Sequence, residues 1–254
     1  MKHILFLSFV LTTLMLSNAT YAQNKKEPFE GTLTYNVTYT SETPVPPAFL
    51  AVMPATITYK AKGNKTFCSA LTLGGALAEC DIFDSDAKKI FFIIKQMDST
   101  IVIVQSLEEM QKMADSISKN APKPSFKKLN GTKVIAGYAC KTGLYTHTNP
   151  DSLNSLTTDT LWYNENLYLP GIMMIQDIAF HQIVPGFVVD SYLYLSNTIY
   201  NKHNFLKQTQ RIKEIKKEKI PDSVFELPKG VKVMTMREYK EFKKKNSEKD
   251  EDKK

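Results

Sequence analysis

Between residues 29 and 40 apolar and polar side chains alternate, and this pattern restricts the fold more than any other feature of the sequence. Successive side chains of a strand point to opposite faces, so the alternation gives one apolar face and one wet face. One solvated face is typical of antiparallel sheets, whereas strands of a parallel sheet are apolar on both sides. The apolar set is Phe29, Leu33, Tyr35, Val37 and Tyr39, and Glu30, Thr32, Thr34, Asn36 and Thr38 lie between.

Further short apolar runs bounded by turn residues predict a mainly β fold built as a meander of hairpins. After a proline-containing loop, we expect strands at 55–67 with a turn at Gly63-Asn64, and then at 76–83, 89–95 and 100–105. Beyond a connection at 120–125, strands are expected at 132–136, 138–147 and 160–163, with a break across the polar segment 149–159. Strands near 187–195 and 197–215 close the sheet, and the many lysines of the second suggest an edge.

Two capping boxes predict where helices begin. Ser106 with Glu109, and Thr235 with Glu238, are spaced so that each side chain can bond the other residue's free backbone N–H. A short helix is also expected at 171–182. From Lys243 onward, lysines and acids have nothing to bury, so this end of the chain is expected to be disordered.

The first 22 residues predict a cleavable export signal. Lys2 gives a positive start, residues 4–16 an apolar run, and Thr20-Tyr21-Ala22 a small-residue ending. The run is shorter than the roughly 20 apolar residues of a membrane-spanning helix. No cysteine lies near the cleavage point for lipid attachment. We therefore expect a periplasmic protein, with extracellular release as the alternative, in which 23–234 form a single antiparallel β domain and 235–254 a charged helical or disordered tail.

The formal net charge of +7 raises the question of a nucleic-acid or acidic-lipid partner. The lysines are scattered and interleaved with acids, which favours a solvated surface, and export separates the protein from most nucleic acid. We expect no nucleic-acid partner.

Three cysteines in an oxidising compartment permit one disulfide. Cys68 and Cys80 flank a Leu73-Gly74-Gly75 turn and would lie opposite each other across a three-residue hairpin loop, so they are the natural candidate pair. Connectivity cannot be read from spacing, which leaves the pairing open.

Reactive side chains do not form a recognisable catalytic or metal-binding pattern. His147, His181 and His203 lack the paired spacing of zinc sites, so no metal and no cofactor is expected. Asp177 and His181 could pair on a helix, but no nucleophile motif accompanies them. Cys140 fits a strand pattern in which a small thiol is buried. The cluster Glu79, Asp81, Asp84 and Asp86 lacks the glycine and terminal glutamate of a calcium loop, and a hairpin turn explains its last members.

Large apolar and aromatic side chains on the strands are either core or the lining of a cavity for one apolar ligand, since a curved sheet closed by helices can leave such a space. The candidate lining residues are Leu33, Tyr35, Val37, Tyr59, Phe92, Trp162, Tyr192 and Tyr194.

Several short motifs, taken in order, resemble a family of exported bacterial envelope proteins. They are Phe29-Glu30-Gly31-Thr32-Leu33-Thr34-Tyr35, Tyr59-Lys60-Ala61-Lys62-Gly63-Asn64-Lys65, Ile135-Ala136-Gly137-Tyr138-Ala139-Cys140-Lys141, Leu161-Trp162-Tyr163, Pro185-Gly186-Phe187 and Pro221-Asp222-Ser223-Val224-Phe225-Glu226-Leu227-Pro228-Lys229-Gly230. That family is a domain of unknown function whose fold is similar to the LolA and LppX lipoprotein carriers. The resemblance implies a curved antiparallel half-barrel covered by a few helices, an apolar cavity that accepts acyl chains in the carriers, and no catalytic residues.

Two functions compete on this basis. The first is a non-catalytic envelope protein that binds a lipid or other apolar ligand in the half-barrel. The alternative is a structural or protein-interaction module of the envelope with a filled interior. An enzyme is the least favoured class. Ligand, partner and oligomeric state do not follow from residue order.

Overall fold

The computed structural model describes residues 29–41, 44–72, 77–95, 100–118, 122–149, 152–167, 169, 184, 187–196 and 205–251. The export signal expected at 1–22 and the helix expected at 171–182 lie outside these residues.

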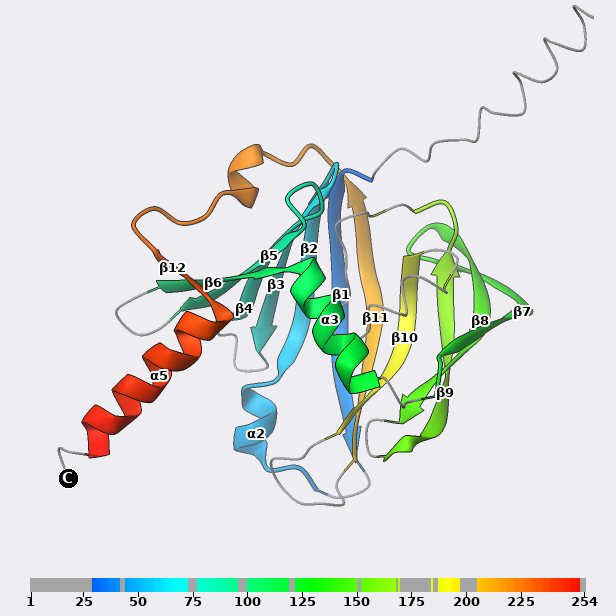
Figure 1. Ribbon diagram of the computed structural model, residues 1–254. Helices are drawn as coiled ribbons and strands as arrows, with labels where there is room; N and C mark the ends of the chain where they lie inside the picture. Colours follow the sequence, from blue (N-terminus) through cyan, green and yellow to red (C-terminus); the bar gives the residue numbers. More distant parts are fainter. Residues whose placement is uncertain are drawn as a thin grey trace, which may run out of the picture.

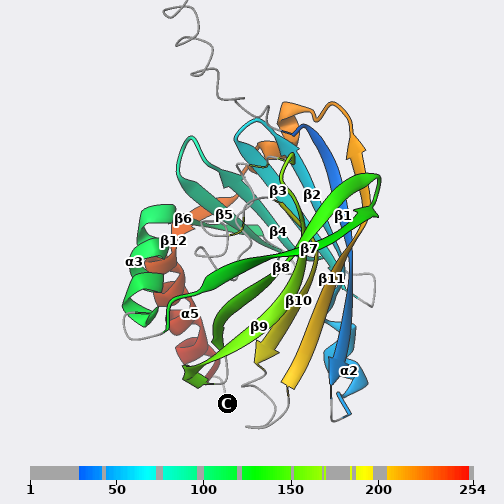
Figure 2. The same ribbon diagram turned by 90° about the vertical axis from the view of Figure 1, so that its right-hand side faces the viewer.

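Twelve strands form one sheet that curves into an open half-barrel (Figures 1 and 2). Its order is β12-β6-β5-β4-β3-β2-β1-β11-β10-β9-β8-β7, and only β12 and β6 pair in parallel. The predicted class, a curved and mostly antiparallel β half-barrel with few helices, is confirmed. The strands are β1 (Gly31–Ser41), β2 (Pro54–Lys62), β3 (Lys65–Thr72), β4 (Leu77–Asp84), β5 (Lys89–Lys95), β6 (Thr100–Ser106), β7 (Ser125–Ile135), β8 (Tyr138–Asn149), β9 (Ser152–Asn164), β10 (Phe187–Ser196), β11 (Phe205–Lys217) and β12 (Lys232–Thr235).

The alternation that predicted β1 also sets its two faces. Leu33, Tyr35 and Val37 are buried, whereas Asn36 and Thr38 on the other face are exposed. β1 pairs with β2 on one side and with β11 on the other, so it lies in the middle of the sheet.

Strand β11 is a central strand, and its predicted place at an edge is wrong. It lies between β1 and β10. Its exposed Arg211 and Lys213 flank the buried Ile212 on alternate positions. Lysines on one face therefore mark the solvated side of a central strand here, and the edges of the sheet are β12 and β7.

The break predicted across 149–159 is also wrong, because β8 and β9 form one long hairpin. β9 begins at Ser152, and Asp159 lies opposite Tyr145 in the ladder. The Thr-rich sequence of this segment is compatible with a strand, since β-branched threonine favours extended backbone.

The candidate disulfide between Cys68 and Cys80 is not present in the structure. Cys80 lies opposite Ser69, one residue away from Cys68, so the two thiols project from opposite faces of the sheet. The cause is a bulge between Ala70 and Leu71, which shifts the register by one residue between the turn and the cysteines. None of the three cysteines is in a disulfide.

The helices are α2 (Pro47–Ala51), α3 (Leu107–Ser118), the 3-10 turn η1 (Asp222–Phe225) and α5 (Met236–Glu251). Both capping boxes form: Ser106 and Glu109 exchange bonds before α3, and Thr235 and Glu238 do so before α5. Figures 1 and 2 show α3 and α5 on the same, open side of the half-barrel. α5 continues to Glu251, so the disorder expected from Lys243 is not found there.

The two faces of the β3–β6 region bury separate clusters. On the outer face, η1 and the segment after it cover a cluster through Phe225, Leu227 and Val231; the covered residues are Cys80, Ile82, Ile93 and Val102. On the inner face, the core continues from β1 and β2 toward β5 and β6, where the candidate site lies.

Candidate functional site

One transverse row of side chains crosses eight strands on the concave face. Each member lies directly opposite the next in the ladders, so all of them project from the same side of the sheet. The row is Ile215, Leu33, Tyr59, Cys68, Asp81, Phe92, Ile103 and Met234. It is apolar or aromatic at both ends and contains a single charged residue, Asp81.

At the β1 end the row is tightly packed. Leu33 is 0% exposed and Tyr35, on the next row, is 2% exposed. The rings of Tyr35 and Tyr59 meet edge to face with centroids 5.8 Å apart. The Tyr35 hydroxyl donates a 2.8 Å hydrogen bond to the carbonyl of Val188, which ties β1 to β10. These expected lining residues therefore serve as core.

Asp81 makes the middle of the row polar. It is 4% exposed and lies opposite Cys68, which in turn lies opposite Tyr59. Burial, with the neighbouring Cys68, Tyr35 and Asp81, raises the pKa of the Tyr59 phenol well above its ordinary value. Asp81 is therefore a deeply buried acid among the largely apolar and aromatic residues of the row.

The β5–β6 end of the row is covered by side chains of β12 and α5. Phe92 and Ile94 are half-buried and pack with Ile101 and Ile103 in one cluster. The cluster is closed by Met234 of β12 and by three side chains of the helix, Met236, Tyr239 and Phe242. Apart from these three, the described side chains of α5 are exposed and mostly charged.

The remaining expected lining residues do not join this row. Trp162 is half-buried against the core cluster of β1, and the Lys133 ammonium lies 4.3 Å from its ring centroid. In the ladder between β10 and β11, Tyr192 lies opposite Thr209 and Tyr194 lies opposite Lys207. Gln210, which lies opposite Val37, alternates with Thr209 and therefore belongs to the other face of β11. The side chains of Tyr192 and Tyr194 lie outside the described part of the chain.

A partly buried histidine–carboxylate pair was not predicted from the sequence, which pointed to Asp177 and His181; both of those lie outside the described residues. His147 Nε2 is 2.8 Å from Asp159 Oδ2, and Asp159 is 4% exposed. The Tyr145 ring stacks on the imidazole at 5.0 Å. Recognising β8 and β9 as one hairpin is the signal that would have brought these residues together.

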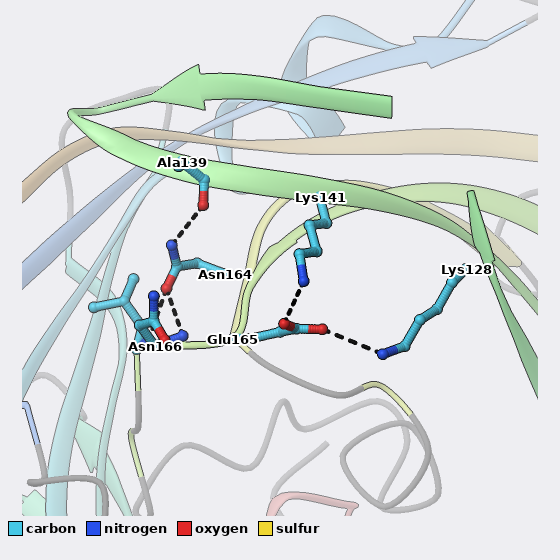
Figure 3. Close-up of polar contacts among 7 residues, drawn as sticks. Lys128, Ala139, Lys141, Asn164, Glu165 and Asn166 are labelled. Carbon is cyan, nitrogen blue, oxygen red and sulfur yellow. Dashed lines mark hydrogen bonds and ion pairs between the residues drawn. The ribbon is translucent and has the colours of Figure 1, made fainter. Parts of the chain in front are cut away.

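Where the chain leaves β9, Asn164 directs it into the core (Figure 3). Its Nδ2 donates to the carbonyl of Ala139 at 2.7 Å, and its Oδ1 accepts the backbone N–H groups of Asn166 and Leu167 at 2.8 Å each. Leu167 and Leu169 consequently pack against the cluster that contains Leu33.

Cys140 and Asp84, the other candidate reactive residues with described positions, make local structural contacts. The Cys140 thiol is 1% exposed and donates to the carbonyl of Tyr138 at 3.2 Å. Asp84 Oδ1 accepts the N–H of Ala87, so it serves the β4–β5 turn. Within the described ranges, no three His, Cys, Asp or Glu side chains gather closely enough to hold a metal ion. No helix there is both long and apolar enough to cross a bilayer.

Comparisons with known proteins find likenesses among solved structures. No protein-family model and no curated protein matches the sequence. The crystal structure of the Mycobacterium tuberculosis lipoprotein LppX is similar with a TM-score of 0.36 and 12% sequence identity, over 71% of this chain and 85% of that one. The fold class follows from the strand order and pairing above. The resemblance to the exported family stays a prediction.

Proposed function

We propose that this chain is an exported, non-catalytic protein that binds a lipid or another apolar ligand on the concave face of its half-barrel. The observation that carries the proposal is the half-buried apolar surface at Phe92 and Ile94, which is covered by Met234 of β12 and by three side chains of an otherwise charged helix. The ligand site then comprises this end of the row, whereas Leu33, Tyr35 and Val37 form the packed wall behind it.

Apolar burial would supply the affinity. Each buried methylene contributes about 0.8 kcal/mol, so a chain of about ten methylenes contributes roughly 8 kcal/mol before the cost of association. That cost is of order 4 kcal/mol or more, so a long chain binds and a short one does not. Selectivity for the tail would be broad, because apolar burial is not directional.

In this proposal the ligand and α5 compete for the same surface. Replacing Tyr239 and Phe242 by serine removes the competing side chains and is expected to tighten binding of a long-chain fluorescent fatty acid severalfold. Lys240→Ser, an exposed position on the same helix, is the matched control and should leave the affinity unchanged. If the wild type, the serine variant and the control bind the fatty acid equally tightly, the ligand does not bind at the surface that α5 covers.

The direct test of the function is the content of the protein made in its own host. Mild organic extraction followed by mass spectrometry should recover a long-chain apolar compound in near-stoichiometric amount. Protein that carries none, and that binds no long-chain probe afterwards, would refute ligand binding.

A second function, an envelope interaction module, is favoured by the dense packing of Leu33, Tyr35 and Val37, which are all at most 4% exposed. It predicts that removing 237–254 abolishes capture of an envelope partner and leaves binding of the apolar probe unchanged. The ligand proposal predicts instead that the same truncation changes the affinity for the apolar probe.

A further inference from the structure

The tip of the β7–β8 hairpin exposes apolar side chains. Residues Val134, Ile135, Ala136, Gly137, Tyr138 and Ala139 run through the turn without a charged residue. Ile135 and Tyr138 face inward and pack against the core. Val134 is 73% exposed, and Ala136 and Ala139 are also exposed. The tip is therefore held by one pair of side chains while the others face outward.

The turn itself does not account for this composition. Ala136 and Gly137 both have positive φ, 48° and 82°, as a two-residue hairpin turn requires. Asparagine or glycine adopts the first of these positions with less strain than alanine, and asparagine is better solvated. Alanine therefore occupies a position where the local backbone favours asparagine or glycine.

Lysines lie along the hairpin, and Lys133 and Lys141 are the two nearest the turn. The segment 122–149 contains five lysines and no aspartate or glutamate, unlike the interleaved charges of the chain as a whole. Glu165 is the acid that reaches this group: it accepts from Lys141 at 2.6 Å and from Lys128 at 3.3 Å (Figure 3). The hydrogen bond from Lys141 lowers the pKa of Glu165. Five lysines and this one glutamate leave a local net charge of +4.

We propose that the β7–β8 tip is a contact surface for an anionic lipid bilayer. The lysines would face lipid phosphates while Val134 and Ala136 enter the headgroup region, which is the arrangement of interfacial membrane contacts. Protection of the edge strand β7 against aggregation accounts for lysines on it, but not for an exposed apolar tip. This contact is independent of whether the concave face holds a ligand.

Co-sedimentation of the mature chain with vesicles of phosphatidylglycerol and phosphatidylcholine tests the proposal. We expect Val134→Ser to weaken binding about tenfold, since a buried valine contributes on that order. Val52→Ser is the matched control, because Val52 is 64% exposed and caps the C-terminus of α2. This variant should bind vesicles as the wild type does. The emission of Trp162, the only tryptophan, should shift to shorter wavelength on docking.

Charge reversal provides the second arm. Lys133→Glu with Lys141→Glu, the two lysines nearest the turn, should abolish the salt-dependent part of binding, whereas Lys213→Glu with Lys217→Glu, also exposed on β11, should change it little. Circular dichroism spectra matching the wild type confirm that the variants are folded. The proposal is overturned if Val134→Ser binds as tightly as the wild type. It is also overturned if neutral phosphatidylcholine vesicles bind equally well, or if the folded wild-type chain ignores vesicles and is captured through the tip by a protein instead.

Discussion

Truncating Leu33 tests whether the centre of the concave face is packed or hollow. Leu33 is 0% exposed at the β1 end of the row. Leu33→Ala removes three buried carbons, which at about 0.8 kcal/mol each gives roughly 2.4 kcal/mol, and the cavity left behind raises the expected loss toward about 5 kcal/mol. For a domain of this size, each kcal/mol lowers Tm by about 2–4 °C, so Tm should fall by about 5–20 °C.

Urea unfolding followed by Trp162 emission and by circular dichroism measures this loss. Asn36→Ala, on the exposed face of the same strand, is the control and should cost less than about 0.5 kcal/mol. A loss below about 1 kcal/mol for Leu33→Ala would show that the leucine lines open space, and the packed wall assigned to it would have to be abandoned.

Three further predictions follow from particular contacts. Burial raises the pKa of Tyr39 from 10.0 to about 12, so the stability it contributes is present below pH 10 and lost as pH rises toward 12; Tyr39→Phe should flatten that part of a urea-midpoint profile relative to wild type. Ser106→Ala removes the cap of α3 and should cost about 0.5–2 kcal/mol in unfolding free energy, whereas a loss near zero would contradict the capping role. Non-reducing peptide mapping should find no bond between Cys68 and Cys80, and detection of that cross-link would refute the bulged register.

Structural features that depend on a few neighbouring residues were predicted correctly from local sequence patterns. The alternation around Leu33 identified the buried face of β1, and the spacing of Thr235 and Glu238 identified the start of α5, because both depend on side chains within one element. The end of α5 was harder to predict. Its charged side chains suggested disorder, but pairs such as Arg237 with Glu241 lie one turn apart on the helix, where they stabilise it.

Properties of the whole sheet could not be read from the sequence. A single bulge between Ala70 and Leu71 moves Cys80 to the opposite face from Cys68, and the residue types at these positions do not predict the bulge. Asp81 was considered as one of a local acidic group, because only the β4–β5 and β3–β4 registers place it opposite Phe92 and Cys68. The pairing of His147 with Asp159 likewise depends on where the β8–β9 hairpin turns.

Photo-crosslinking with a diazirine-tagged long-chain fatty acid is the most direct test of ligand binding on the concave face. Bound probe should label peptides of β5 and β6 around Phe92, and excess untagged fatty acid should suppress that labelling. Labelling that does not saturate, or that falls on the outer-face segment 222–231, would contradict the account.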